Sequence, residues 1–137
     1  MRNVTENEIT NLSAVRTSVA DRVFMLAMSM IHWANNIRPN LDGSKVGGHQ
    51  ASSASSVHIL CSLLLETLTG SDRIAIKPHA SPVFHAIQYL LGNLDESYLT
   101  QFRAWQGLQS YPSRTKDPDV VDFSTGSVGL PGSAGAF

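Results

Sequence analysis

The stretch LDGSKVGGHQASSASSVHILCSLLLETL, residues 41–68, changes from small and polar residues to a nearly continuous apolar run. Glycine is costly in regular structure, so the pair Gly47 and Gly48 marks a place where the backbone turns tightly or approaches another group closely. The serine-rich run that follows His49 leads into leucines, so residues 51–68 are predicted to form a largely buried helix. We therefore expect another part of the molecule to lie against Gly47, Gly48 and His49.

The residues before this stretch have the pattern of an amphipathic helix. Residues 7–36 contain no glycine or proline, and Pro39 lies beyond their end as a stop signal. The pattern predicts one helix, or two in succession, because apolar residues recur at spacings of three and four. These residues are Ile9, Leu12, Val15, Val19, Val23, Leu26 and Met30.

The residues after it contain one predicted strand and one clear helix. The segment DRIAIK, residues 72–77, alternates isoleucine with small or charged residues and is too short for a helix, which favours a strand. The segment SPVFHAIQYLLG predicts a helix with Ser81 as N-cap, Pro82 at its first position and Gly92 as C-cap.

The rest of the chain is expected to be less regular. The segment LDESYLTQFRAW predicts another helix, with Asp95 as its cap. Beyond Trp105, prolines and glycines interrupt the pattern, so an irregular C-terminal stretch is expected, with residues 1–6 and 131–137 flexible.

Composition limits the classes of function. A chain of 137 residues with 42% hydrophobic and 15% charged residues is expected to form a single globular domain. The formal charge of -1 shows no electrostatic footprint of the kind that binding to a phosphate backbone requires, so no nucleic-acid partner is expected. The single Cys61 cannot form an intramolecular disulfide, and we interpret it as a buried helix residue. The apolar run at 23–31 is too short to span a membrane, so a cytoplasmic protein with no membrane partner is expected.

Two histidines occupy loop-to-helix junctions. His49 lies in VGGHQAS, and His79 lies in IKPHASP just beyond the predicted strand, where ligands bind in many α/β folds. Each alone has a plain alternative as a capping or hydrogen-bonding group. The remaining histidines, His32, His58 and His85, lie within helical patterns and are interpreted as structural.

A glycine-containing loop is the third candidate element. In STGSVGL, residues 124–130, glycines alternate with small residues, so backbone groups can face a ligand. The segment matches neither a Walker loop nor a dinucleotide fingerprint, and a surface turn is the alternative interpretation.

Taken in order, GGHQAS, DRIAIKPHASP, FR with QSYP, and STGSVGL resemble the amino-terminal region of thiamine-diphosphate enzymes of the transketolase family. The closer branch is the homodimeric pyruvate dehydrogenase decarboxylating component with its transketolase-like relatives. The resemblance covers residues 19–130 and implies an α/β thiamine-diphosphate-binding fold for the full enzyme. It also implies thiamine diphosphate and magnesium as cofactors, a 2-keto acid or ketose as substrate, carbon–carbon cleavage with two-carbon transfer, and a homodimer.

The resemblance also assigns roles to residues. His49 is similar to the family histidine that reaches toward the substrate, and His79 to the one beside the diphosphate and thiazolium. Both are therefore catalytic candidates. His79, Gly126, Ser127 and Val128 are the cofactor-binding candidates. We expect both histidines and the 126–129 loop to converge on one crevice.

Departures from the family pattern concern the metal and the end of the chain. The Gly-Asp-Gly stretch and later asparagine that hold the family's magnesium do not occur after Leu130, so no metal ligand is assigned. The sequence reads as an amino-terminal fragment, a single partial domain over residues 1–137. It is expected to be mostly helical with one short strand and inactive in isolation.

Other functions remain open on sequence alone. One is a non-enzymatic helical interaction module or an inactive remnant. Another is a hydrolase that uses His49 and a serine such as Ser53, although no nucleophile elbow is present. Whichever holds, the core is expected to include Leu60, Leu63, Leu64, Ile87, Leu90 and Leu91.

Overall fold

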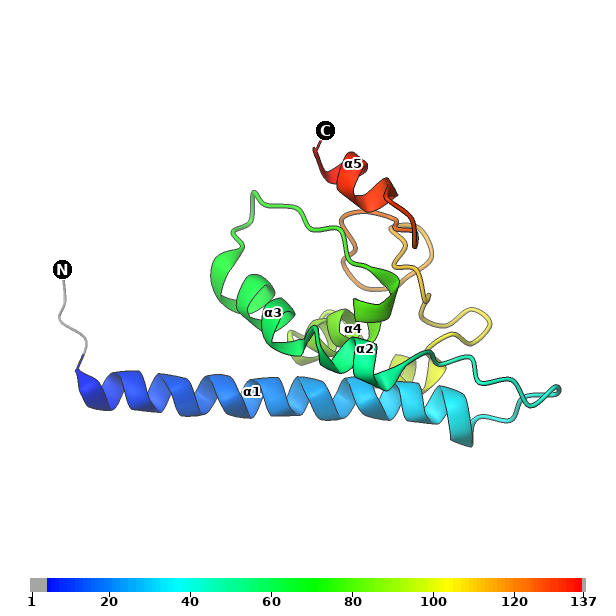
Figure 1. The fold of residues 1–137 in the computed structure, drawn as a ribbon, viewed down its shortest axis with the longest axis horizontal. Helices are drawn as coiled ribbons and strands as arrows, with labels where there is room; N and C mark the ends of the chain where they lie inside the picture. Colours follow the sequence, from blue (N-terminus) through cyan, green and yellow to red (C-terminus); the bar gives the residue numbers. More distant parts are fainter. Residues whose placement is uncertain (1–4, 137) are drawn as a thin grey trace.

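One long helix, α1 (Glu6–His32), lies along the molecule, and the other elements pack on one side of it (Figure 1). This computed structural model describes residues 5–136. Thr5 and Glu8 begin α1 with a reciprocal capping box. The helix ends in a wider π-helical turn, η1 (Trp33–Ile37). The helix predicted for residues 7–36 is therefore confirmed as one continuous unit.

The single helix expected over residues 51–68 is wrong. The structure has three short pieces instead: α2 (Gln50–Ala54), α3 (Val57–Ser62) and the π-helical turn η2 (Leu63–Thr67). At the break, the Ser55 hydroxyl donates to the Ser52 carbonyl and the Ser56 hydroxyl to the Ser53 carbonyl. Such local bonds compete with helix hydrogen bonds, which explains why the serine run interrupts the helix.

The central helix is α4 (Ser81–Leu90), which follows the 3₁₀ turn η3 (Pro78–Ala80). Every residue from 81 to 88 is buried. Ser81 is not the N-cap, because Ala80 holds that position and the Ser81 hydroxyl donates to the Pro78 carbonyl at 2.7 Å. Gly92 ends the helix with φ +79°, as predicted.

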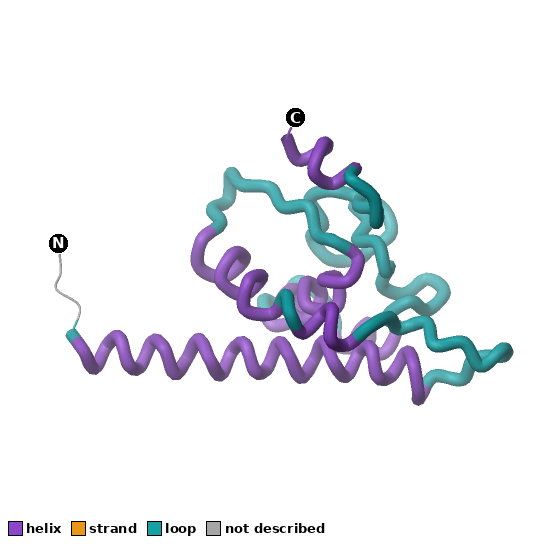
Figure 2. The backbone as a smooth tube through the Cα atoms, in the orientation of Figure 1, coloured by secondary structure: helices purple, strands orange, loops and turns teal. Residues whose placement is uncertain are grey.

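The strand predicted over residues 72–77 is absent, and none of the described residues forms a strand (Figure 2). The segment has no regular secondary structure, and Ile76 is buried. A carboxylate takes the place of a neighbouring strand, because Asp122 Oδ2 accepts from the Ile74 amide at 3.0 Å. The described part of the chain is therefore mostly helical, as expected, but without the short strand.

The C-terminal third differs from expectation in two places. The predicted helix after Asp95 is a short 3₁₀ helix, η4 (Glu96–Gln101), although Asp95 does cap it by accepting from the Ser97 amide. The predicted irregular end contains the helix α5 (Leu130–Ala136). Residues 1–4 and 137, which were expected to be flexible, lie outside the described residues.

The core consists of two apolar clusters along α1. One joins Val23 and Ala27 of α1 to α3 and α4, and the other joins Met30 and Ile31 to the region of η4. Of the predicted core residues, Leu60 and Ile87 are buried and Leu63 and Leu64 are half-buried. Leu90 and Leu91 are 42% and 52% exposed, so their prediction is wrong. No helix within residues 5–136 has the length and apolarity to cross a bilayer.

Candidate active site

The structure brings His49 and His79 together. His49 occupies the N-cap position of α2, and His79 lies within η3. Their rings stack with centroids 6.0 Å apart and planes inclined by 25°. Both side chains are exposed, so a solute can reach them. The two histidines that the sequence singles out thus form one surface feature, although their catalytic roles stay predictions.

The Gly47–Gly48 turn is held against the end of α1. The Asn35 side-chain amide donates to the Gly48 carbonyl at 3.0 Å, and its Oδ1 accepts from the Gly47 amide at 2.6 Å. A Cβ on Gly47 would lie 2.5 Å from the Ile31 carbonyl oxygen, so only glycine fits there. Gly48 has φ +86°, a conformation that also favours glycine.

Arg103 covers the other side of this turn. Its guanidinium lies 3.4–3.6 Å from the place where a Cβ on Gly48 would stand, and Nη1 donates to the Val46 carbonyl at 2.6 Å. Burial lowers the pKa of Arg103. Arg38 secures the neighbouring backbone by donating to the Phe102 carbonyl at 2.7 Å. The groups expected against Gly47 and Gly48 are therefore Asn35 and Arg103.

The glycine-containing loop makes one bond to the histidine region. Lys77, just before η3, donates through Nζ to the Val128 carbonyl at 3.4 Å. Ser127 and Val128 are exposed. A Cβ on Gly126 would meet no atom within 4 Å, so this glycine is not required by packing. Convergence of the loop on both histidines stays a prediction.

The described residues do not fit a magnesium-held diphosphate by themselves. Across residues 5–136, no three or more His, Cys, Asp or Glu side chains are grouped so that they could hold a metal ion. Magnesium requires several oxygen ligands in near-octahedral geometry. The histidine pair can contact a substrate, but this part of the chain supplies no anchor for the ion.

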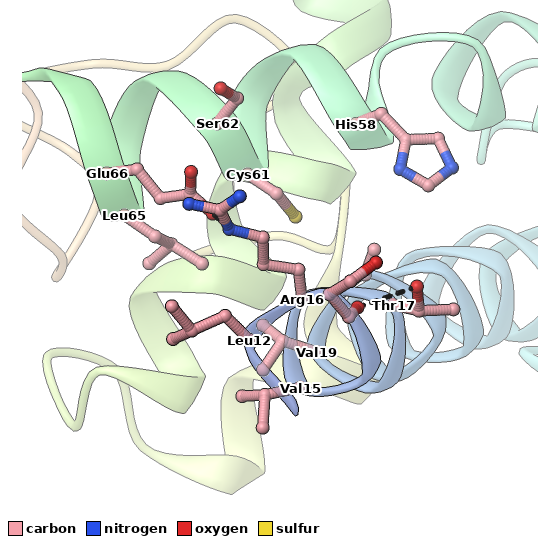
Figure 3. A pocket seen from close by; sticks show the side chains of 12 residues that line it. Leu12, Val15, Arg16, Thr17, Val19, His58, Cys61, Ser62, Leu65 and Glu66 are labelled. Atoms are coloured by element: carbon pink, nitrogen blue, oxygen red, sulfur yellow. Dashed lines mark hydrogen bonds and ion pairs between the residues drawn. The ribbon is translucent and has the colours of Figure 1, made fainter. Parts of the chain in front are cut away.

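A cleft of about 450 Å³ lies away from the histidine pair, between α1 and α3 with η2 (Figure 3). Arg16 and Glu66 form an ion pair across it, with Nε 2.8 Å from Oε1. His58 and Cys61 also line it. Burial raises the pKa of the Cys61 thiol, and the Glu66 carboxylate adds to this effect. The thiol is therefore a poor nucleophile at neutral pH.

The hydrolase interpretation with Ser53 is wrong. The Ser53 side chain is 1% exposed, and its hydroxyl donates to the His79 carbonyl at 2.5 Å. A serine nucleophile needs an accessible oxygen beside a base. Ser53 is therefore not placed to act as a nucleophile, and no sequence pattern indicates its partner.

A second histidine site is buried and includes His85 of α4. His85 Nδ1 lies 2.6 Å from Asp119 Oδ2, and both side chains are fully buried. The interpretation of His85 as structural is confirmed by this burial. Asp117, close by, accepts from the Gln109 and Ser113 amides at 2.7 Å, and burial raises its pKa. Sequence patterns did not identify either aspartate, because both lie in an irregular segment.

Known proteins give a consistent comparison. No family model matches the chain. The chain is 35% identical over 113 residues to the pyruvate dehydrogenase E1 component of Pseudomonas aeruginosa. It is 36% identical over 115 residues to the component of the same name from Mycolicibacterium smegmatis. Each match covers 76% of this chain and 12% of the relative.

The protein of that name from Haemophilus influenzae is 32% identical over 114 residues, which is 74% of this chain and 13% of the relative. The chain thus spans about an eighth of the length of these curated relatives. The likeness is to pyruvate dehydrogenase components, and a relationship to transketolases is not shown by it.

Proposed function

We propose that this chain is a segment of a thiamine-diphosphate-dependent enzyme of the pyruvate dehydrogenase type that acts on a 2-oxo acid. The observation that carries the proposal is the stacked, exposed pair His49 and His79, at the two positions to which the family resemblance assigns a catalytic role. The similarity to pyruvate dehydrogenase E1 components supports it. On this proposal, the whole enzyme is a homodimer whose magnesium is held by residues outside this chain.

The pair suits the handling of a 2-oxo acid. An imidazole can donate or accept a hydrogen bond and can move a proton near neutral pH. Two adjacent rings can therefore contact the carbonyl and carboxylate oxygens of one small substrate. Lys77, the residue directly before η3, adds a positive charge near His79 in the sequence, and its Nζ donates to the Val128 carbonyl. These groups bind and orient the substrate and exchange protons with it.

A chimera tests the proposal. The matching segment of the Pseudomonas aeruginosa component is replaced by this chain, and pyruvate decarboxylation is measured with thiamine diphosphate and magnesium. The chimera is expected to be active. His49→Ala and His79→Ala are each expected to lower kcat by about 100-fold or more, the range for loss of a general acid or base.

The matched control is His58→Ala, since His58 is also exposed but lies on α3, at the cleft between α1 and α3. It is expected to keep kcat within about twofold, in line with a surface substitution. An active chimera that tolerates loss of both His49 and His79 would refute the assignment.

A helical interaction module is the second candidate function. It is favoured by exposed apolar residues on the first half of α1, where Ile9, Leu12 and Val15 are 53–59% exposed. Binding through this surface would be insensitive to His49→Ala and His79→Ala. Replacement of Leu12 by Gln would abolish it, so the two functions are separable.

A further inference from the structure

Ser53 differs from the other serines of the run that follows His49. It is the only buried one of the four, with 1% of its surface exposed, whereas Ser52 and Ser55 are exposed and Ser56 is half-buried. The Ser55 and Ser56 hydroxyls bond carbonyls of their own segment. The Ser53 hydroxyl instead has its acceptor outside α2, because it donates to the His79 carbonyl in η3 at 2.5 Å.

Ser53 is also bonded to His49. Its backbone amide donates to the His49 carbonyl at 3.3 Å, one helical turn earlier. One buried residue therefore contacts the backbone of both candidate catalytic histidines. The link has little freedom at each end, because one side-chain torsion sets the position of a serine hydroxyl oxygen and no side-chain torsion affects a backbone amide.

We propose that Ser53 is a positioning residue that fixes the separation of the His49 and His79 rings. This inference rests on the proposed function of the two histidines. Without the Ser53 hydroxyl, α2 and η3 lose their direct hydrogen bond, and the rings no longer keep their 6.0 Å separation. Misplacement of a catalytic group by about 1 Å can lower a rate by about 100-fold. Ser53 itself touches no substrate, so it acts on kcat through the histidines.

The structure supplies a matched control at Ser81. This serine is also fully buried, and its hydroxyl also donates to a carbonyl of η3, that of Pro78, at 2.7 Å. Ser81 begins α4, directly after η3, and makes no contact with α2 through this bond. Ser81→Ala therefore removes a buried hydroxyl of the same kind without removing the bridge between the histidines. Ser55→Ala, directly after α2, serves as the exposed control.

The first measurement uses the chain itself. Nuclear Overhauser contacts between the His49 and His79 ring protons are recorded for the wild type, Ser53→Ala, Ser53→Cys, Ser81→Ala and Ser55→Ala. Circular dichroism checks that each variant is folded. Contacts are expected to be lost in Ser53→Ala and kept in both controls. Ser53→Cys keeps the packing with a weaker donor, so it tests the bond if Ser53→Ala does not fold.

The second measurement uses the active chimera. Ser53→Ala is expected to lower kcat by up to about 100-fold with KM changed less than about threefold, whereas Ser81→Ala keeps kcat near the wild-type value. Unchanged ring contacts in Ser53→Ala, or an equal loss of kcat in Ser81→Ala, would overturn the positioning role. If the ring contacts depend on Ser53 but neither histidine matters for turnover, the proposed function fails and the structural bridge stands.

Discussion

His85 and Asp119 form a buried pair that joins α4 to the irregular segment before α5. Nδ1 of His85 and Oδ2 of Asp119 are 2.6 Å apart, and the two residues are separated by 34 positions in the chain. Neither side chain is exposed to solvent, while His85 Nε2 and Asp119 Oδ1 have no hydrogen-bond partner among the described residues. Within residues 5–136, each side chain therefore makes its only hydrogen bond with the other.

Removal of one member of this pair is expected to be costly. Asp119→Ala leaves His85 buried without a partner, and the free energy of unfolding is expected to fall by about 3–5 kcal/mol. Urea unfolding measures the change. Asp21→Ala, on the exposed side of α1, is the control and is expected to change stability by less than about 0.5 kcal/mol. A loss below about 1 kcal/mol for Asp119→Ala would show that the pair does not hold the segment.

Substitution of the two glycines Gly47 and Gly126 is expected to change the stability of the fold by different amounts. Gly47→Ala places a Cβ 2.5 Å from the Ile31 carbonyl and is expected to destabilise by about 1–3 kcal/mol. Gly126→Ala meets no atom within 4 Å and is expected to be nearly neutral. Thermal unfolding of the two variants provides the comparison. Equal effects would contradict the packing of the Gly47 turn against α1.

Cys61 predicts a pH dependence. Burial raises the pKa of its thiol above the ordinary value of 9.0, so the unfolded thiol ionises before the folded one. The contribution of the protonated Cys61 thiol to stability is thus complete below pH 9.0. It is lost as the pH rises through the pKa of this thiol in the folded chain. The iodoacetamide reaction rate of the folded chain is expected to reach half its maximum above pH 9.0. Cys61→Ala is expected to remove this part of the alkaline loss of stability.

Leucines at buried and at exposed sites are expected to differ in how much they contribute to the free energy of unfolding. Leu60→Ala, at a site that is 6% exposed, should lower stability by about 2–5 kcal/mol. Leu91→Ala, at a site that is 52% exposed, should change it by less than about 0.5 kcal/mol. Leu64 is half-buried and should fall between them. Chemical denaturation checks the order.

The chain alone is expected to show no magnesium-dependent thermal shift with thiamine diphosphate. The reason is that its sequence lacks the Gly-Asp-Gly stretch and later asparagine. Saturation at 100 times the dissociation constant would add about 2.7 kcal/mol, which a melting curve detects. A shift that requires magnesium and disappears in the His49→Ala, His79→Ala double variant would contradict this prediction.

Much of the helical architecture follows from local pattern. The spacing from Ile9 to Met30 was sufficient for α1, and Gly92 for the end of α4, because both signals act within a few residues. The break at Ser55 and Ser56 was missed because serine-to-backbone bonds compete with the helix that the apolar run favours. The strand was misjudged for another reason, since alternation at Ile74 and Ile76 cannot report whether a partner strand exists.

The sequence indicates His49 and His79 as candidate site residues, but it does not indicate which residues hold them in place. His49 and His79 stand out by their motifs. Their proximity depends on Ser53, and the turn before His49 depends on Asn35 and Arg103. These contacts join segments remote in sequence, and a hydrogen bond between remote segments leaves no periodic signal.

The burial pattern of α1 divides this helix into two parts that differ in how their backbone amides exchange with solvent. Its buried residues begin at Ala20, so the turns before it depend mainly on their own hydrogen bonds, the Thr5 cap and the Arg16–Glu66 ion pair. Helices of about 12–15 residues are marginal when they stand alone in water. Backbone amides from Thr10 to Thr17 will therefore exchange with deuterium through local opening. Amides from Val23 to Ile31 will exchange only when the whole domain unfolds.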